Sequence, residues 1–326
     1  MKIKYHAFIR VIGIIIFIII LYKINVLSII PVLKKSNPVL LSASIVLLFP
    51  LMLVKTMRWN SLLKMQMIQY SFTDVFSIYM ASFYFGMITP GRIGDFFKMF
   101  YLVKEKSVSY GKAFANVLSD RLFDVVVIMI ITIMGLLVFG LAGSHIYVTL
   151  FLFCSLVIGI LIFSHGKMLI LVLKTLFRSA VGKPRQKVIF HVNDFIEELQ
   201  QLRSVKLIIP FLLTIVIYGI IFFQCYFIAQ AVGIRLSYFY IAFAVSLAQI
   251  IALLPVSYLG IGPRDGILIY VFGLVEISPQ KAIGFSLVYL ALFFLLTGIW
   301  GAVCWFRRPI RFADLKVRTR IRTPTM

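Results

Sequence analysis

The chain of 326 residues is 62% hydrophobic and 13% charged, with a mean hydropathy of +1.04. A soluble domain of this length does not carry so much apolar side chain, and several apolar runs exceed the roughly 18 residues that cross a bilayer. Most of the charge of +22 lies between the apolar runs, where it suits membrane topology and lipid headgroups rather than nucleic acid. We therefore expect an all-α polytopic membrane protein, with residues 1–326 forming a single integral membrane domain.

The apolar runs predict about six full transmembrane helices. The first run follows Lys2, Lys4 and Arg10 and has no small-residue cleavage site, so it predicts a retained helix instead of a signal peptide. The predicted spans are Phe8–Leu27, Pro38–Lys55, Arg121–Leu141, Ile146–Phe163, Leu207–Val232 and Ala282–Phe306.

Two further apolar stretches, residues 74–104 and 238–275, are interrupted by glycine and proline. The first break reads "TPGRIGD" and the second "LPVSYLGIGPRDG", and the piece after each break is short for a full crossing. We expect each stretch to form a re-entrant hairpin that returns to its own side of the membrane. The residues that make the breaks are Pro90, Gly91, Gly94, Gly260, Gly262 and Pro263.

The distribution of lysine and arginine predicts the orientation of the chain. With a cytoplasmic N-terminus, most of the 33 basic residues fall on the cytoplasmic side, so we expect a multi-pass protein of the cell membrane with both termini cytoplasmic. Residues 38–142 and residues 207–306 then run in opposite directions and form an inverted repeat. Interrupted segments in corresponding positions of two halves point to a binding site at the membrane midplane.

Residues 167–206 connect the two units on the cytoplasmic side. Apolar residues recur there at alternating four- and three-residue steps from Val188 to Leu202, which predicts an amphipathic linker helix at the membrane interface. Residues 307–326 form a basic cytoplasmic tail, which we interpret as solvated or bound to lipid headgroups.

Each break places an arginine and an aspartate just after a proline: Arg92 and Asp95, then Arg264 and Asp265. Because proline suits the first turn of a helix, the breaks predict two helix N-termini in one cavity, where the arginines add charge suited to phosphate. The alternative is an ion pair between Arg92 and Asp95 that holds a hairpin and binds nothing. Adjacent Arg264 and Asp265 point in different directions on a helix, so we expect one of them to need another partner.

A third charged cluster, "SDRLFD" at residues 119–124, opens a predicted span. Arg121 and Asp124 either line the cytoplasmic mouth of the cavity or, with the neighbouring acids, cap a helix N-terminus. Arg58 and Trp59 end the second span on the same side. We interpret Trp59 as an interface anchor and Arg58 as a headgroup contact that is also a candidate substrate-binding residue.

The sequence predicts no cofactor and no metal site. The three cysteines lie in apolar runs without ligand spacing, and the four histidines are scattered along the chain. The sequence has no G-x-x-x-x-G-K-[ST] motif that would bind ATP.

Taken in order, "RW" at residues 58–59, "PGRIGDFFKMF", "SDRLFD" and "LPVSYLGIGPRDG" resemble the lysylphosphatidylglycerol synthase transmembrane-region family of flippase-like membrane proteins. The resemblance covers residues 8–306, with aspartate where the family often has glutamate at positions 95, 120 and 265. It implies re-entrant helices in inverted repeats and translocation of an anionic lipid. The best-known members also carry a soluble aminoacyltransferase domain that does not occur in this sequence, so we do not expect synthase activity.

We expect a flippase-like protein, not an enzyme, that moves an anionic phospholipid, an aminoacyl-lipid or a polyprenyl-phosphate-linked lipid between leaflets. Arg92 and Arg264 would hold the phosphate, while Asp95 and Asp265 alternate partners. The expected partner is an anionic membrane lipid, and a separate lipid-modifying enzyme or glycosyltransferase is a second candidate partner.

Two alternative functions stay open. The first is a membrane enzyme that acts on lipid-linked phosphate or sugar through Asp120 and Asp124. The second is a non-transporting scaffold for a membrane glycosyltransferase.

Overall fold

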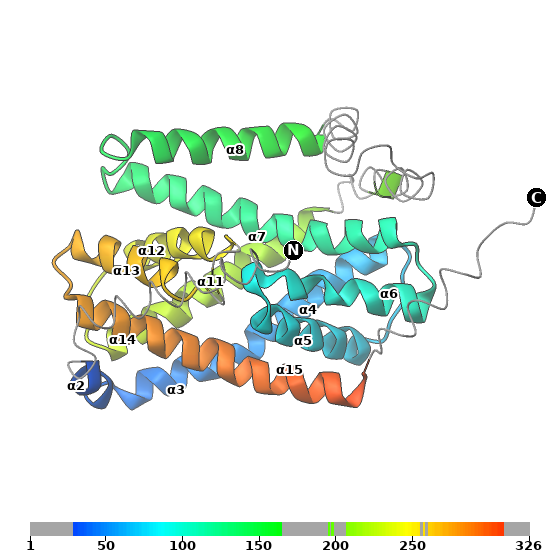
Figure 1. Cartoon of the computed structure of the whole chain (residues 1–326), viewed down its shortest axis with the longest axis horizontal. Helices are drawn as coiled ribbons and strands as arrows, with labels where there is room; N and C mark the ends of the chain where they lie inside the picture. Colours follow the sequence, from blue (N-terminus) through cyan, green and yellow to red (C-terminus); the bar gives the residue numbers. More distant parts are fainter. Residues whose placement is uncertain are drawn as a thin grey trace, which may run out of the picture.

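The computed structural model describes residues 29–164, 195, 197–198, 207–254, 257 and 260–309. This part of the chain is helical and has no strand, and its long helices lie side by side along the long axis of the molecule (Figure 1). The predicted first span Phe8–Leu27, most of the linker 167–206 and the tail beyond residue 309 lie outside the described residues. The expected all-α polytopic membrane architecture is confirmed.

Four helical stretches of the described part are long and apolar enough to cross a membrane. They agree with the predicted spans, except that the span expected to start at Arg121 begins at Tyr110 and the span expected to end at Lys55 continues to Met65. An apolar helix, α8 (Ile146–Ser164), accompanies them. The four stretches are Pro38–Met65, formed by α3 (Pro38–Val46) and α4 (Leu48–Met65), then α7 (Tyr110–Val138), α11 (Ile208–Ala231), and Pro279–Arg307, formed by α14 (Pro279–Tyr289), the π-helical turn η4 (Leu290–Leu295) and α15 (Leu296–Arg307).

Local sequence accounts for several helix boundaries. The Asn37 side chain accepts hydrogen bonds from the first turn of α3, and Ser109 caps α7 by accepting from the backbone N–H of Lys112. The boundary between α3 and α4 at Leu47 precedes Pro50, whose ring removes a helical hydrogen bond to the preceding turn.

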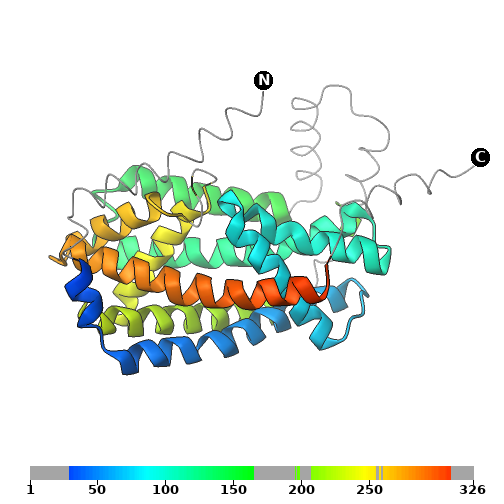
Figure 2. The same ribbon diagram turned by 60° about the horizontal axis from the view of Figure 1, so that its bottom comes forward.

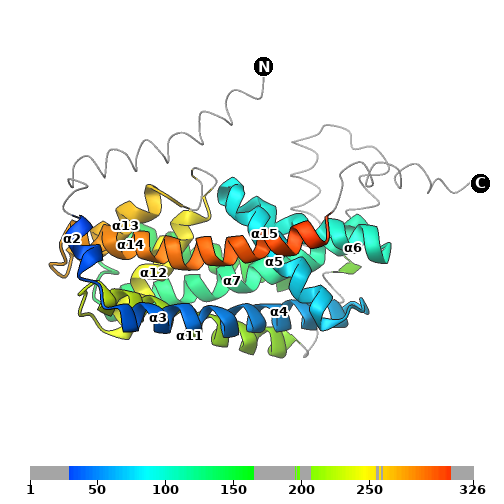
Figure 3. The same cartoon turned by 90° about the horizontal axis from the view of Figure 1, so that it is seen from below.

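Two broken hairpins occupy opposite ends of the helix bundle and turn near its middle (Figures 1 and 3). The first broken hairpin consists of α5 (Phe72–Ile88), the 3₁₀ segment η2 (Pro90–Phe97) and α6 (Lys98–Lys106). The second consists of α12 (Tyr238–Ala252) and α13 (Pro263–Gly273). Both breaks therefore fall where the sequence placed them.

The two breaks differ in backbone conformation from the predicted pair of helix starts. In the first, Gly91 and Arg92 have left-handed φ values of 59° and 56°, and regular α-helix resumes only at Lys98. In the second, α13 does start at Pro263, after Gly262 with φ 93°, a conformation that favours glycine. Only the second break thus contains the predicted α-helix N-terminus.

The two predicted units pack against each other over most of their length. α11 lies against α3 and α4, α12 packs on α7, and α15 runs alongside α5 (Figure 2). The short helix α2 (Ile29–Lys34) packs on α14 at the end of the bundle. A large apolar core joins both units, and a smaller one surrounds Trp59, Tyr79 and Tyr101 near α6. This packing brings residues distant in sequence to one internal cavity.

Candidate functional site

A cavity of about 200 Å³ lies between the two broken hairpins. Gly91 and Arg92 of the first break and Leu253 and Arg264 near the second line the same space, and α4, α7, α11, α14 and η4 also contribute to the wall. The structure therefore brings together the two arginines that the sequence singled out. The charged residues of the wall are Lys55, Arg92, Asp95, Arg121, Asp124 and Arg264.

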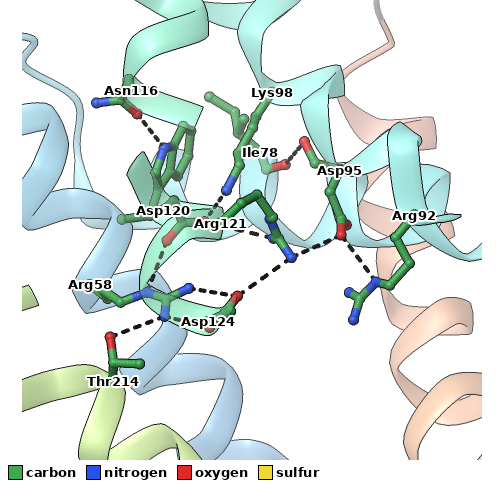
Figure 4. Close-up of polar contacts among 12 residues, drawn as sticks. Arg58, Ile78, Arg92, Asp95, Lys98, Asn116, Asp120, Arg121, Asp124 and Thr214 are labelled. Carbon is green, nitrogen blue, oxygen red and sulfur yellow. Dashed lines mark hydrogen bonds and ion pairs between the residues drawn. The ribbon is translucent and has the colours of Figure 1, made fainter. Parts of the chain in front are cut away.

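Asp95 connects the first broken hairpin to α7. Its Oδ2 atom lies 3.1 Å from Arg92 Nε and 3.0 Å from Arg121 Nη1 (Figure 4). The predicted pair of Arg92 and Asp95 is present, while Arg121 lies closer to Asp95 than to its predicted partner Asp124, at 3.6 Å. The Arg92 side chain also lies over the Phe83 ring and keeps 24% of its surface exposed. Asp95 thus has two cationic partners, both of which line the cavity.

Arg58 joins three helices at a position fully buried behind the cavity. Its Nε lies 2.9 Å from Asp120 Oδ1 and its Nη1 lies 2.6 Å from Asp124 Oδ1, both on α7. Nη1 also donates to Thr214 Oγ1 on α11, at 3.2 Å. The interpretation of Arg58 as a headgroup contact is wrong, because α4 continues past it to Met65 and α7 and α11 pack over its side chain. Arg58 positions the carboxylates and does not line the cavity.

Trp59 and Lys98 extend this buried cluster toward α6. Trp59 donates from Nε1 to Asn116 Oδ1 at 2.7 Å and is fully buried, so its interpretation as an interface anchor is also wrong. The Lys98 ammonium pairs with Asp120 and lies 5.1 Å from the centre of the Trp59 ring and 4.7 Å from that of Tyr79. An aromatic and ionic cage therefore holds Lys98.

The "SDRLFD" cluster does not cap a helix. α7 begins at Tyr110 and is capped by Ser109, so Asp120 and Asp124 lie well inside the helix. Arg58 and Lys98 hold Asp120, while Arg58 donates to both oxygens of Asp124, which also lies 3.6 Å from Arg121. Buried carboxylates require such partners, which explains why these charges are tolerated in an apolar bundle.

The second break forms a compact local cluster. Arg264 Nη2 lies 2.8 Å from Asp265 Oδ1 and donates to Ser286 Oγ at 2.6 Å, and the Ser286 hydroxyl donates to the same carboxylate. The expectation that adjacent Arg264 and Asp265 point apart is wrong. They pair directly, because Asp265 also folds back to accept the Gly262 N–H at 2.9 Å. This carboxylate occupies the N-terminus of α13, so the charge of the cavity comes from side chains rather than from helix ends.

Five of the seven predicted substrate-binding residues line the cavity, and Arg58 and Asp265 lie behind it. Sequence reasoning gave no role to Lys55, which lines the wall, or to Lys98. Lys55 was the last residue of the predicted span Pro38–Lys55, so it was expected at the membrane surface and not in the interior. The apolar residues after Arg58 could have revealed that the helix continues and carries Lys55 into the interior.

This fold and cavity define a polytopic helical membrane protein with a charged network between two broken hairpins. The chain belongs to the family described as the lysylphosphatidylglycerol synthase TM region, which matches residues 8–301. The resemblance seen in the sequence motifs is thereby confirmed.

Curated relatives carry the name UPF0104 membrane protein. The chain is 22% identical over 288 residues to one from Methanothermobacter thermautotrophicus, covering 82% of this chain and 85% of the relative. For the relative from Pyrococcus horikoshii, identity is 22% over 273 residues, with coverages of 77% and 82%. For the relative from Methanocaldococcus jannaschii, identity is 21% over 317 residues, with coverages of 93% and 94%. No solved structure matches the chain significantly.

Proposed function

We propose that this protein moves an anionic lipid between the leaflets of the cell membrane. The headgroup passes through the cavity between the broken hairpins, and the acyl chains stay in the bilayer. One observation carries the proposal: a single internal cavity draws its wall from both units of the chain and presents four cationic side chains against two carboxylates. The cations are Lys55, Arg92, Arg121 and Arg264, and the carboxylates are Asp95 and Asp124.

Charged groups inside a membrane protein are costly, and they commonly mark the path of a substrate. An arginine presents a planar donor group that binds phosphate through two hydrogen bonds, and Arg92 and Arg264 present such groups from the two hairpins. The hairpins lie at opposite ends of the bundle (Figure 3), so a phosphate held between them would lie between the two ends.

Asp95 supplies a way to bind and release the headgroup. It is shared by Arg92 and Arg121, so when Arg92 turns to a phosphate, Asp95 keeps Arg121 as a partner. No carboxylate is then left buried without a cation, which keeps the exchange inexpensive. Arg92 is suited to this movement because its side chain is partly exposed and already borders the cavity.

The inverted repeat and the orientation complete the proposal. Residues 38–142 and 207–306 each contribute one broken hairpin to the cavity wall, and rocking of one unit against the other would open the site to each leaflet in turn. Both termini face the cytoplasm in this arrangement.

The test uses purified protein in liposomes that contain a fluorescent phosphatidylglycerol, with dithionite added outside to report the lipid that has crossed. We expect the wild type to expose the inner-leaflet lipid to dithionite, and Arg92→Ala and Arg264→Ala to abolish this. Arg235→Ala is the matched control, because Arg235 is exposed and does not line the cavity. It should transport like the wild type.

The same liposomes distinguish the alternatives. Chemical conversion of the lipid, detected by mass spectrometry, would replace transport with an enzymatic function. A folded protein that moves none of a panel of phosphatidylglycerol, lysyl-phosphatidylglycerol and polyprenyl phosphate would contradict the proposal and favour a scaffold.

A further inference from the structure

Lys55 is a buried ammonium group that faces the cavity and has no ionic partner in the described part of the chain. It lies on α4, is 5% exposed, and lines the cavity wall. Asp124 lines the same wall, but both of its oxygens already accept hydrogen bonds from Arg58. Among the described residues, Lys55 makes neither a hydrogen bond nor an ion pair. Its charge is therefore available to a group inside the cavity.

The charged network around the cavity carries an excess of positive charge. Among the described residues it contains six cations and four carboxylates, which leaves two positive charges without a counterpart. Three carboxylates are shared between cations: Asp95 by Arg92 and Arg121, Asp120 by Arg58, Lys98 and Arg121, and Asp124 by Arg58 and Arg121. The cations are Lys55, Arg58, Arg92, Lys98, Arg121 and Arg264, and the carboxylates are Asp95, Asp120, Asp124 and Asp265.

A buried hydrogen-bond donor of Arg121 also indicates that the network around the cavity has too little negative charge. Arg121 lines the cavity, and its Nε atom is buried without a hydrogen-bond acceptor in the described part of the structure. Buried donors and charges are normally satisfied, so this unpaired donor and the Lys55 ammonium together indicate that the cavity wall lacks negative charge.

Resting on the proposed function, we propose that the substrate headgroup carries two negative charges on its phosphate, as a phosphomonoester or a pyrophosphate does, and that Lys55 binds this phosphate. A phosphomonoester carries about −1.5 to −2 charges near neutral pH, which matches the excess in the network. A phosphodiester such as phosphatidylglycerol leaves one positive charge uncompensated. A lysyl-phosphatidylglycerol headgroup adds positive charge to a cavity that already has too much, so it is disfavoured.

The experiment compares lipids with identical tails and different headgroup charge. Purified full-length protein in detergent is titrated with dioctanoyl phosphatidic acid, dioctanoyl phosphatidylglycerol and dioctanoyl phosphatidylcholine. We expect phosphatidic acid to bind about tenfold more tightly than phosphatidylglycerol, and phosphatidylcholine to bind most weakly. Lys55→Gln should remove about that tenfold preference. Lys64→Gln, an exposed lysine on the same helix, should keep it.

Two results would overturn the assignment: equal affinity of the wild type for phosphatidic acid and phosphatidylglycerol, or an unchanged preference in folded Lys55→Gln. The melting temperature of each variant shows whether it is folded. If Lys55→Gln does not fold, Lys55→Met is used in its place. Lys55→Arg, which retains the charge, should preserve the preference for phosphatidic acid.

The outcome separates this inference from the proposed function. If liposomes transport phosphatidylglycerol but phosphatidic acid is not preferred in binding, transport stands and the dianion assignment fails. If phosphatidic acid is preferred through Lys55 but no lipid crosses, the ligand stands and transport fails. If inorganic phosphate displaces phosphatidic acid at equal concentration, the dianion assignment stands with a soluble anion as the ligand.

Discussion

The two broken hairpins have similar sequence signatures and different structures. The first, with "PGRIGD", sends Asp95 across to Arg121 on α7 and leaves Arg92 partly exposed to the cavity. The second, with "GPRDG", closes Arg264 and Asp265 on each other and on Ser286, almost without exposure. The two signatures differ chiefly in the spacing of the arginine and the aspartate.

Spacing explains this difference physically. In the first hairpin Asp95 lies three positions after Arg92, beyond a left-handed turn at Gly91 and Arg92, and its carboxylate reaches Arg121 on another helix. In the second hairpin, Asp265 accepts the Gly262 N–H at the start of α13, so its position is fixed by local backbone. We infer that the first hairpin can rearrange and that the second provides a rigid wall.

The largest expected effect comes from Arg58, which connects the network of the first hairpin to α11. Arg58→Ala leaves two buried carboxylates on α7 short of a cation, so we expect a loss of about 3–5 kcal/mol in the free energy of unfolding. Thermal unfolding in detergent measures this loss, with Lys64→Ala on the same helix as a control. A change no larger than the control would mean that the network does not hold the bundle together.

The next effect separates the two hairpins directly. Arg264→Ala removes the partner of a buried carboxylate that has no second cation in the described part, so we expect a loss of about 1.5–3 kcal/mol. Arg92→Ala should cost less than about 1 kcal/mol, because its side chain is partly exposed and Asp95 keeps Arg121. If the proposed transport function holds, both variants should still lose it. Equal losses of stability, measured by thermal unfolding, would contradict the division into an adaptable and a rigid hairpin.

A smaller effect concerns the backbone of the first hairpin. A Cβ atom added at Gly94 would lie 2.0 Å from the Phe85 carbonyl oxygen, so η2 could not pack as closely on α5. We expect Gly94→Ala to destabilise the protein by about 1–3 kcal/mol. Gly273→Ala in the second hairpin is the control, because a Cβ atom there meets nothing within 4 Å. Matching melting temperatures for the two variants would argue against tight packing at Gly94.

The smallest effect is expected where the first hairpin begins and ends, away from the cavity. There Arg308 joins Asp74 on α5 to Glu105 on α6. A hydrogen bond from Ser71, together with Arg308, holds the pKa of Asp74 below its usual value. The stabilisation is therefore present above about pH 4 and is lost as the pH falls through the lowered pKa. Melting temperatures between pH 3 and pH 6 should show a weaker acid dependence for Asp74→Asn than for the wild type. Glu276→Gln, at the opposite end of the bundle, should follow the wild type.

The sequence determined the class of protein, most of the spans and both breaks. Apolar runs long enough to cross a bilayer are a local property, and so are the proline and glycine residues that interrupt a helix. Spacing along one helix also predicted the pair of Arg92 and Asp95, which the structure contains. It failed for Arg264 and Asp265, because Asp265 turned back to the helix start.

Only the tertiary structure decided which charged side chains form ion pairs with one another and which face the cavity. Arg58 and Lys98 are far apart in sequence, and both reach Asp120 because α4, α6 and α7 pack together. Lys55 became a residue of the cavity because α4 continues past the predicted end of the span. Periodicity and composition describe one segment at a time, whereas the pairing of buried charges depends on how several segments pack.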